Sequence, residues 1–422
     1  MYQKKYHLIE LELNSILEIT QVINNNAPED SLYKMYKFTL QGNLQVEKLA
    51  LYVYEDDDSQ WYCKVDFGTN LDFSSIELEA DVLSEIRDIS PVEYVNFSSD
   101  AFLEFDVIIP VFHKDKVLAY VFLDSNESDS ELNDVDTRFV QTLSNIIIVA
   151  IENKKLVRKQ IKQETFQKEL DIAKQVQSML FPKTLPKTNT LQIEATYFPH
   201  QIVGGDYYDY IPISEDEFVL CIADVSGKGV PAALLMSNFQ ASLRTLTRQT
   251  NNLEQIISEL NSLIWENAQG DHFITFFIGL FNRTERTFHY INAGHNPAFL
   301  FYNGKAEQLH SGTTILGIFD PLPFINQKVV EDVEAFLLFC YTDGITETTN
   351  PEGEEFGIDR LMDFVKHNND LSVTNIHNNL IREIQMFKQE NQYSDDITLL
   401  SCRYVRNGDQ EEGSDSHDTL EN

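Results

Sequence analysis

The sequence predicts an α+β protein in which two domains are joined by a long helix. At 422 residues the chain can bury more than one hydrophobic core. Residues 30–125 mix short β-like runs with turns, and residues 188–405 interleave strands, turns and helices. Between them, residues 136–180 contain neither Pro nor Gly, which favours one continuous helix.

The first domain is expected at residues 1–140. Residues 1–25 carry apolar side chains at helical spacing. Four apolar runs are candidate strands, at residues 48–54, 61–67, 105–112 and 117–124. In its order of elements this part resembles a GAF sensor domain, which implies a small-molecule or protein signal as its ligand.

A helical linker is expected at residues 141–187. Two groups of residues repeat every three or four positions: Phe139, Leu143, Ile146 and Ala150, then Phe166, Leu170, Ala173, Gln177 and Leu180. Such spacing is typical of a coiled coil, which predicts a homodimer through the linker. The alternative is a solvated spacer helix without a partner, because the middle of the segment is charged.

Charge and cysteine content narrow the classes of partner and compartment. The chain has 32 basic and 67 acidic residues, a net charge of −35, which argues against nucleic acid and anionic membranes as partners. The 4 cysteines have no CxxC spacing, and no apolar run is long enough to span a bilayer. We therefore expect a cytoplasmic protein, with a disordered acidic tail at residues 406–422.

Four acidic positions in the second domain share one setting, the end of an apolar run beside a turn. They are Asp206 after a Gly pair, Asp224 after the run 218–223, Asp343 after the run 335–341, and Asp395 or Asp396 before the run 397–400. A carboxylate at the end of a buried strand is costly unless a cation or strong donors accompany it. Each acid alone is more often a turn or cap residue.

If the four acids converge, they repel one another and require cations. Oxygen ligands without His or Cys suit Mg²⁺ or Mn²⁺ rather than zinc. Two such ions, bridged by one carboxylate, would activate a water and hold a phosphoryl group. The pattern therefore indicates hydrolysis of a phosphate ester without a protein nucleophile.

Several motifs of this part resemble a known family in order and spacing. They are VGGDYYDY (203–210), ADVSGKGVPAALLM (223–236), NAGHNP (292–297), YTDGITE (341–347), FG (356–357) and SDDITLL (394–400). The resemblance is to the metal-dependent PPM, or type 2C-like, phosphatases, in their bacterial branch of SpoIIE and RsbU. It implies that residues 188–405 form an α-β-β-α sandwich with two Mn²⁺ or Mg²⁺ ions between the sheets.

The resemblance also implies roles for individual residues. Asp224 would bridge both metal ions, and the carbonyl of Val225 would bind one of them. Asp343 and Asp395 would complete the other site.

The resemblance also implies roles for two further acids, and it supports one of them as a metal ligand more strongly than the other. Asp206 would bind a metal directly or through water. Asp396 stands where many relatives have Asn, which makes it the weaker candidate ligand of the pair.

The function implied is a sensor-regulated protein serine/threonine phosphatase. In the resembling branch the usual substrate is a phosphorylated STAS-domain anti-sigma-factor antagonist, attacked by a metal-bridged hydroxide. Two alternatives remain open: a catalytically weak dimeric binding module, and an enzyme that releases phosphate from small molecules.

Overall fold

The fold is described from a computed structural model of the 422-residue chain. The structure describes residues 2–43, 46–56, 58–78, 83, 86–114, 116–124 and 137–406. The contacts divide the chain into two units, Met1–Thr165 and Phe166–Asn422. The acidic tail expected at 406–422 lies, from residue 407 onward, outside the described residues.

The first unit is built on an antiparallel sheet with the strand order β2-β1-β5-β4-β3. Its strands are β1 (Leu49–Glu55), β2 (Gln60–Phe67), β3 (Ser90–Pro91), β4 (Val107–His113) and β5 (Lys116–Leu123). The four long strands lie within three residues of the expected ones at each end, because their apolar runs fill the sheet. This mixed α+β structure agrees with the expectation for the region, while the GAF-like assignment stays a prediction.

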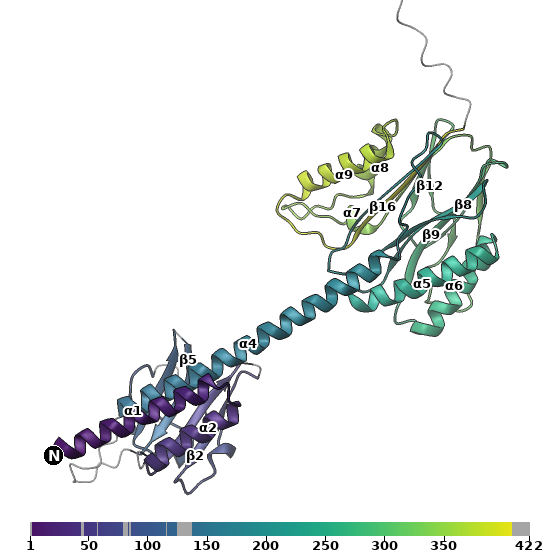
Figure 1. The fold of residues 1–422 in the computed structure, drawn as a ribbon. Coiled ribbons are helices and arrows are strands. Elements are labelled where there is room, and N and C mark those ends of the chain that lie inside the picture. Colours follow the sequence, from purple (N-terminus) through teal and green to yellow (C-terminus); the bar gives the residue numbers. More distant parts are fainter. Residues whose placement is uncertain are drawn as a thin grey trace, which may run out of the picture. The chain divides into compact units, whose positions relative to one another are not determined.

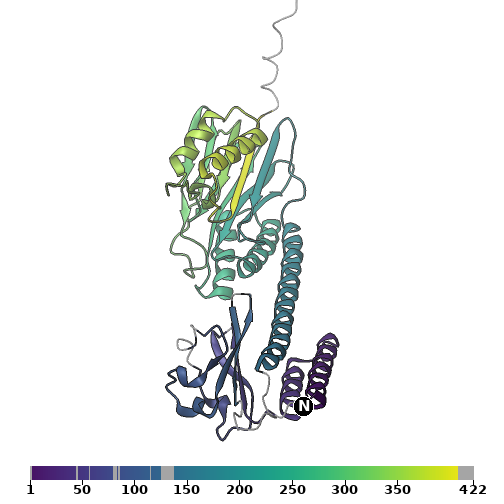
Figure 2. The ribbon, with the colours of Figure 1, turned by 90° about the vertical axis from the view of Figure 1, so that its left-hand side faces the viewer.

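Helices cover one face of this sheet. They are α1 (Tyr2–Asn24), α2 (Glu29–Phe38) and the first part of α4 (Thr137–Ser178). Figure 2 shows them on the same side of the strands. Their apolar side chains, among them Ile19, Tyr36 and Leu143, form one core with the strands. The other face carries a separate aromatic cluster that includes Tyr52, Phe73, Phe102 and Phe122.

The second unit contains two further sheets. One has the order β13-β10-β9-β8-β7 with β14 paired to β10, and the other has the order β12-β11-β15-β16-β6. Neighbouring strands are antiparallel except β10 and β13. The strands are β6 (Leu191–Phe198), β7 (Tyr207–Pro212), β8 (Glu217–Val225), β9 (Ile274–Asn282), β10 (Thr287–Ala293), β11 (Ala298–Tyr302), β12 (Lys305–Leu309), β13 (Gly312–Thr313), β14 (Lys328–Val330), β15 (Phe336–Tyr341) and β16 (Ile397–Tyr404).

The two sheets face each other and carry helices on their outer sides. Figure 1 shows α5 (Val230–Gln249) and α6 (Leu253–Ala268) beside one sheet, and α8 (Ile358–His367) and α9 (Val373–Lys388) beside the other. Three apolar clusters fill the spaces between these four layers. The layers confirm the α-β-β-α sandwich expected for this part of the chain.

The helix α4 contributes to both units. Its first turns pack in the core of the first unit, through Val140, Leu143 and Ile147. Near its end, Gln177 is buried and Leu180 packs against the core of the second unit. Part of the heptad seam expected for a coiled coil is therefore used inside the single chain. None of the helices described is long and apolar enough to cross a membrane.

Candidate active site

The strand β8 carries Asp224 to one edge of its sheet. Its side chains alternate between two cores: Val219, Cys221 and Ala223 pack under α5 and α6, while Phe218, Leu220 and Ile222 pack between the sheets. Because both faces are buried, the strand is apolar from Phe218 to Ala223. Asp224 is the second-last residue of the strand and is half-buried.

Asp206 is the most deeply buried of the candidate acidic ligands, with 1% of its surface exposed. Two hydroxyls donate to its Oδ2 atom, Thr342 Oγ1 at 2.9 Å and Thr398 Oγ1 at 2.5 Å. Thr342 directly follows β15, and Thr398 is the second residue of β16. This pair of donors could not be predicted from the sequence, because each lies more than 130 residues from Asp206.

Two glycines bring the four motifs into contact. A Cβ atom at Gly205 would lie 2.7 Å from the carbonyl oxygen of Val225, and one at Gly344 would lie 2.0 Å from the carbonyl oxygen of Asp396. A side chain at either position would collide with backbone, so only Gly permits these approaches. The turn at Asp206, the end of β8, the turn at Asp343 and the start of β16 therefore converge at one place.

The two adjacent acids at the start of β16 have different surroundings. Asp396 accepts hydrogen bonds from the backbone N–H groups of His200 (2.7 Å) and Gly205 (2.8 Å), one on each carboxylate oxygen. Asp395 forms an ion pair with Lys228 across 2.8 Å and is about one-third exposed. Asp396 thus holds two loops in place, whereas Asp395 faces the carboxylate cluster and its one neighbouring ammonium.

The carboxylates shift one another's ionisation. Burial, and then the charges of Asp343 and Asp395, raise the pKa of Asp224 to about 7. Burial and the charge of Asp224 raise the pKa of Asp206 well above its usual range. Burial and Asp395 also raise the pKa of Asp343. The cluster therefore holds more negative charge than its protein surroundings stabilise.

This donor set fits hard divalent cations. It consists of carboxylate oxygens and the carbonyl of Val225, which are the ligand types of Mg²⁺ and Mn²⁺. In the described part of the chain, no three or more His, Cys, Asp or Glu side chains already stand arranged to hold a metal ion. The fit therefore rests on the chemistry and mutual repulsion of the acids.

The end of α4 is bonded directly to the turn that precedes Asp206. Gln177 is 6% exposed, and its Nε2 atom donates to the carbonyl of Gly204 at 2.7 Å. The N–H of Gly204 lies 3.4 Å from Gln177 Oε1. The side chain of Gln240 on α5 donates to the carbonyl of Leu180 at 3.2 Å, next to the end of the same helix.

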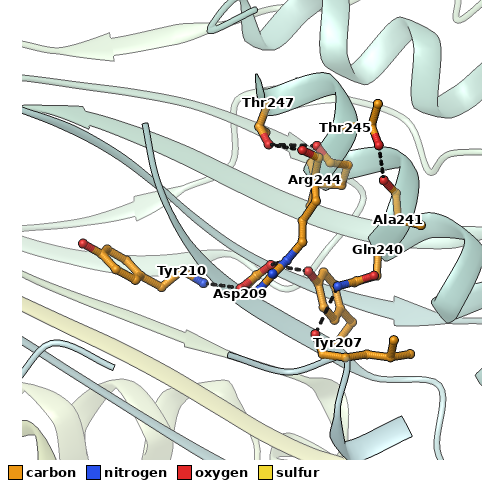
Figure 3. A network of polar contacts seen from close by, with 10 residues as sticks. Tyr207, Asp209, Tyr210, Gln240, Ala241, Arg244, Thr245 and Thr247 are labelled. Carbon is orange, nitrogen blue, oxygen red and sulfur yellow. Dashed lines mark hydrogen bonds and ion pairs between the residues drawn. The ribbon is translucent and has the colours of Figure 1, made fainter. Parts of the chain in front are cut away.

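An ion pair between a buried carboxylate and a partly exposed arginine fixes α5 against β7, as Figure 3 shows. Asp209 is fully buried, and Arg244 donates to both of its oxygens at 2.7 and 2.9 Å. The hydroxyl of Tyr207 donates to the same carboxylate at 2.5 Å, and the N–H of Tyr210 does so at 2.9 Å. Every carboxylate lone-pair direction therefore has a donor in reach, which offsets the burial of the charge. Because α5 begins directly after the Asp224 turn, this pair fixes the helix that supports the site.

Comparisons with known proteins agree on the second unit. Residues 214–405 match the family model described as Stage II sporulation protein E (SpoIIE). A curated relative is the phosphoserine phosphatase RsbU of Bacillus subtilis, 29% identical over 248 residues, which cover 57% of this chain and 71% of the relative. Another is the phosphoserine phosphatase RsbP of the same organism, 25% identical over 54% of this chain and 56% of the relative.

Two further matches extend this picture. Protein IcfG of Synechocystis is 30% identical over 51% of this chain, and the match spans 38% of its own length. The chain thus covers less than two thirds of RsbP and IcfG. Among solved structures, the SiaA-PP2C domain of Pseudomonas aeruginosa has a TM-score of 0.52 at 19% identity, covering 58% of this chain and 98% of that one. This likeness shows a PP2C-like fold for the second unit.

Proposed function

We propose that this chain is a metal-dependent protein serine/threonine phosphatase, because residues 214–405 match the SpoIIE family model and the second unit has a PP2C-like fold. Its reaction is the hydrolysis of a phosphoserine or phosphothreonine monoester. The observation that carries the proposal is the convergence of Asp206, Asp224, Asp343 and Asp395 at one edge of the sandwich, with the pKa raised in three of them.

In this proposal Asp224 would hold two cations, Mn²⁺ or Mg²⁺, the carbonyl of Val225 would bind one of them, and Asp343 and Asp395 would complete the other site. When bound, these cations supply a nucleophilic water and stabilise the phosphoryl oxygens. Asp206 binds a cation directly or through water, and the hydroxyls of Thr342 and Thr398 fix its orientation.

The remaining acid of the cluster acts differently. Asp396 positions the His200 and Gly205 loops through its two backbone hydrogen bonds. Asp396 is 7% exposed, whereas Asp395 is about one-third exposed and its charge acts on both Asp224 and Asp343, so we propose Asp395 rather than Asp396 as the metal ligand. Lys228 balances part of the charge of Asp395.

The substrate in this proposal is a phosphorylated STAS-domain anti-sigma-factor antagonist. Support comes from the similarity to RsbU and RsbP, both phosphoserine phosphatases by name. The first unit is the candidate sensor, for which the order of its strands and helices is the support.

We further propose that two chains associate through α4. The support is a series of apolar side chains that α4 exposes in the single chain: Leu156, Val157, Ile161, Phe166, Ile172 and Val176. A second copy would remove this surface from water. A sedimentation mass of one chain at micromolar concentration would exclude this arrangement.

The experiment is a phosphate-release assay on the full chain after treatment with EDTA. We expect turnover of a phosphoserine-bearing STAS protein when Mn²⁺ is added, and none while EDTA is in excess. Equal turnover of glucose 6-phosphate would instead favour a small-molecule phosphatase. No turnover of any phosphoprotein with Mn²⁺ or Mg²⁺ would favour the weak binding module.

A further inference from the structure

A second cavity of the phosphatase unit lies away from the carboxylate cluster. It has a volume of about 470 Å³ and is lined by the β11–β12 hairpin, the end of α8 and the ends of β15 and β16. Phe336, the first residue of β15, pairs with Tyr404, the last of β16, and both line it. Asp343 and Asp395 lie beyond the other ends of these two strands. The cavity and the carboxylate cluster therefore occupy opposite ends of the same strand pair.

Basic side chains dominate the charged lining of this cavity. Lys305, Lys366 and Arg403 line it, against one acid, Asp370. The chain as a whole has 67 acidic and 32 basic residues, so this local balance is the reverse of the overall one. A cavity with that balance attracts anions.

Arg403 is held in a fixed position at the cavity. Its Nη2 atom donates to the carbonyls of Asn369 and Leu371 in the turn between α8 and α9. Its Nε atom is buried and, among the residues described, has no hydrogen-bond partner. Burial lowers the pKa of this guanidinium. Arg403 therefore adds a fixed positive charge to the lining of the cavity.

Aromatic rings stand beside these cations. Phe301 and Tyr302 on β11 line the cavity and are half-buried. The ammonium of Lys305 lies 5.9 Å from the centre of the Tyr302 ring. Rings that are partly exposed next to a cation offer a flat surface on which a base can stack.

We propose that this cavity binds a nucleotide. Lys305 and Lys366 contact its phosphates, and Tyr302 or Phe301 stacks on its base. A volume of about 470 Å³ is within the range of small-molecule sites. This inference goes beyond the proposed phosphatase reaction, since none of these residues belongs to the carboxylate cluster.

The test is titration calorimetry of the full chain with ATP in EDTA. Without divalent cations the carboxylate cluster repels ATP, so binding reports on the basic cavity. We expect one ATP per chain. The double variant Lys305→Glu/Lys366→Glu should raise the Kd at least about tenfold, because two phosphate contacts become repulsive. Asp370→Asn should lower the Kd, because it removes the one acid.

Lys328→Glu is the matched control, since it makes the same charge change on β14, outside the cavity lining. We expect its Kd to stay within about twofold of the unchanged chain. Tripolyphosphate separates the contribution of the base, and it should bind at least about tenfold more weakly than ATP. The proposal is overturned if ATP does not bind, if the double variant and the control weaken binding equally, or if tripolyphosphate binds as tightly as ATP.

Discussion

A carboxylate as deeply buried as Asp206 needs hydrogen-bond donors, because the neighbouring acids make its negative charge more costly. The hydroxyls of Thr342 and Thr398 provide two donors on one oxygen, and the charge of Asp224 opposes its ionisation. The sequence singled out these acids as one group, because each ends or precedes an apolar run, and their role as metal ligands stays a prediction. It could not predict the two threonines, whose role depends on contacts between distant strands.

A buried histidine makes the stability of the second unit depend on pH in a predictable way. His377 on α9 is 2% exposed and contacts Thr196 Oγ1 and Ser401 Oγ, each at 2.8 Å. Burial lowers its pKa to about 4, and Glu194 opposes that shift only in part. Because the unfolded chain takes up the proton near pH 6.5, the folded state loses stability as the pH falls from there towards 4.

We therefore expect His377→Gln to make the unit less sensitive to acid. Between pH 7 and pH 5 its free energy of unfolding should fall by about 2 kcal/mol less than that of the unchanged chain. Urea unfolding measures this in a Trp61→Phe background, because the sequence has 2 tryptophans and Trp265 then reports on the second unit alone. Parallel pH profiles of the two proteins would contradict the assignment.

At the scale of elements, the apolar pattern of the sequence predicts where a strand lies better than it predicts which residues join one element to another. The apolar run at 218–223 lies within β8, Glu217–Val225, and the run at 335–341 is β15, Phe336–Tyr341. The interaction that fixes α5 to β7 escaped prediction. Asp209 and Arg244 are 35 residues apart, and nothing in either local pattern links them.

Removing Arg244 should destabilise the second unit strongly. Arg244→Ala leaves the fully buried Asp209 with Tyr207 and a backbone N–H but no cation, at a cost of about 3 kcal/mol. The control is Arg248→Ala, which removes an exposed arginine from the same helix and should change stability by less than about 0.5 kcal/mol. Urea unfolding followed through Trp265 compares the two, and equal losses would refute a structural role for the ion pair.

At the scale of the whole chain, the sequence predicted two α+β regions, the sandwich and the long helix. It did not predict how the end of α4 is used. The heptad interpretation assigned Gln177 to a seam between chains, whereas its amide bonds the backbone of Gly204. A glutamine carries both donors and acceptors, so it satisfies a buried turn where an apolar seam residue would not. A long helix with this spacing can pack against its own chain or against a second chain, and the sequence pattern does not distinguish the two.

The central claim is that the converging carboxylates hold the cations for phosphate-ester hydrolysis. Its most direct test is Mn²⁺-dependent release of phosphate from a phosphoserine protein by Asp224→Asn, beside Asp216→Asn on the exposed β7–β8 turn. We predict a loss of at least about a hundredfold for the first variant, with its unfolding temperature in EDTA not lowered, and unchanged activity for the second. Mn²⁺-dependent turnover retained by Asp224→Asn would contradict the claim.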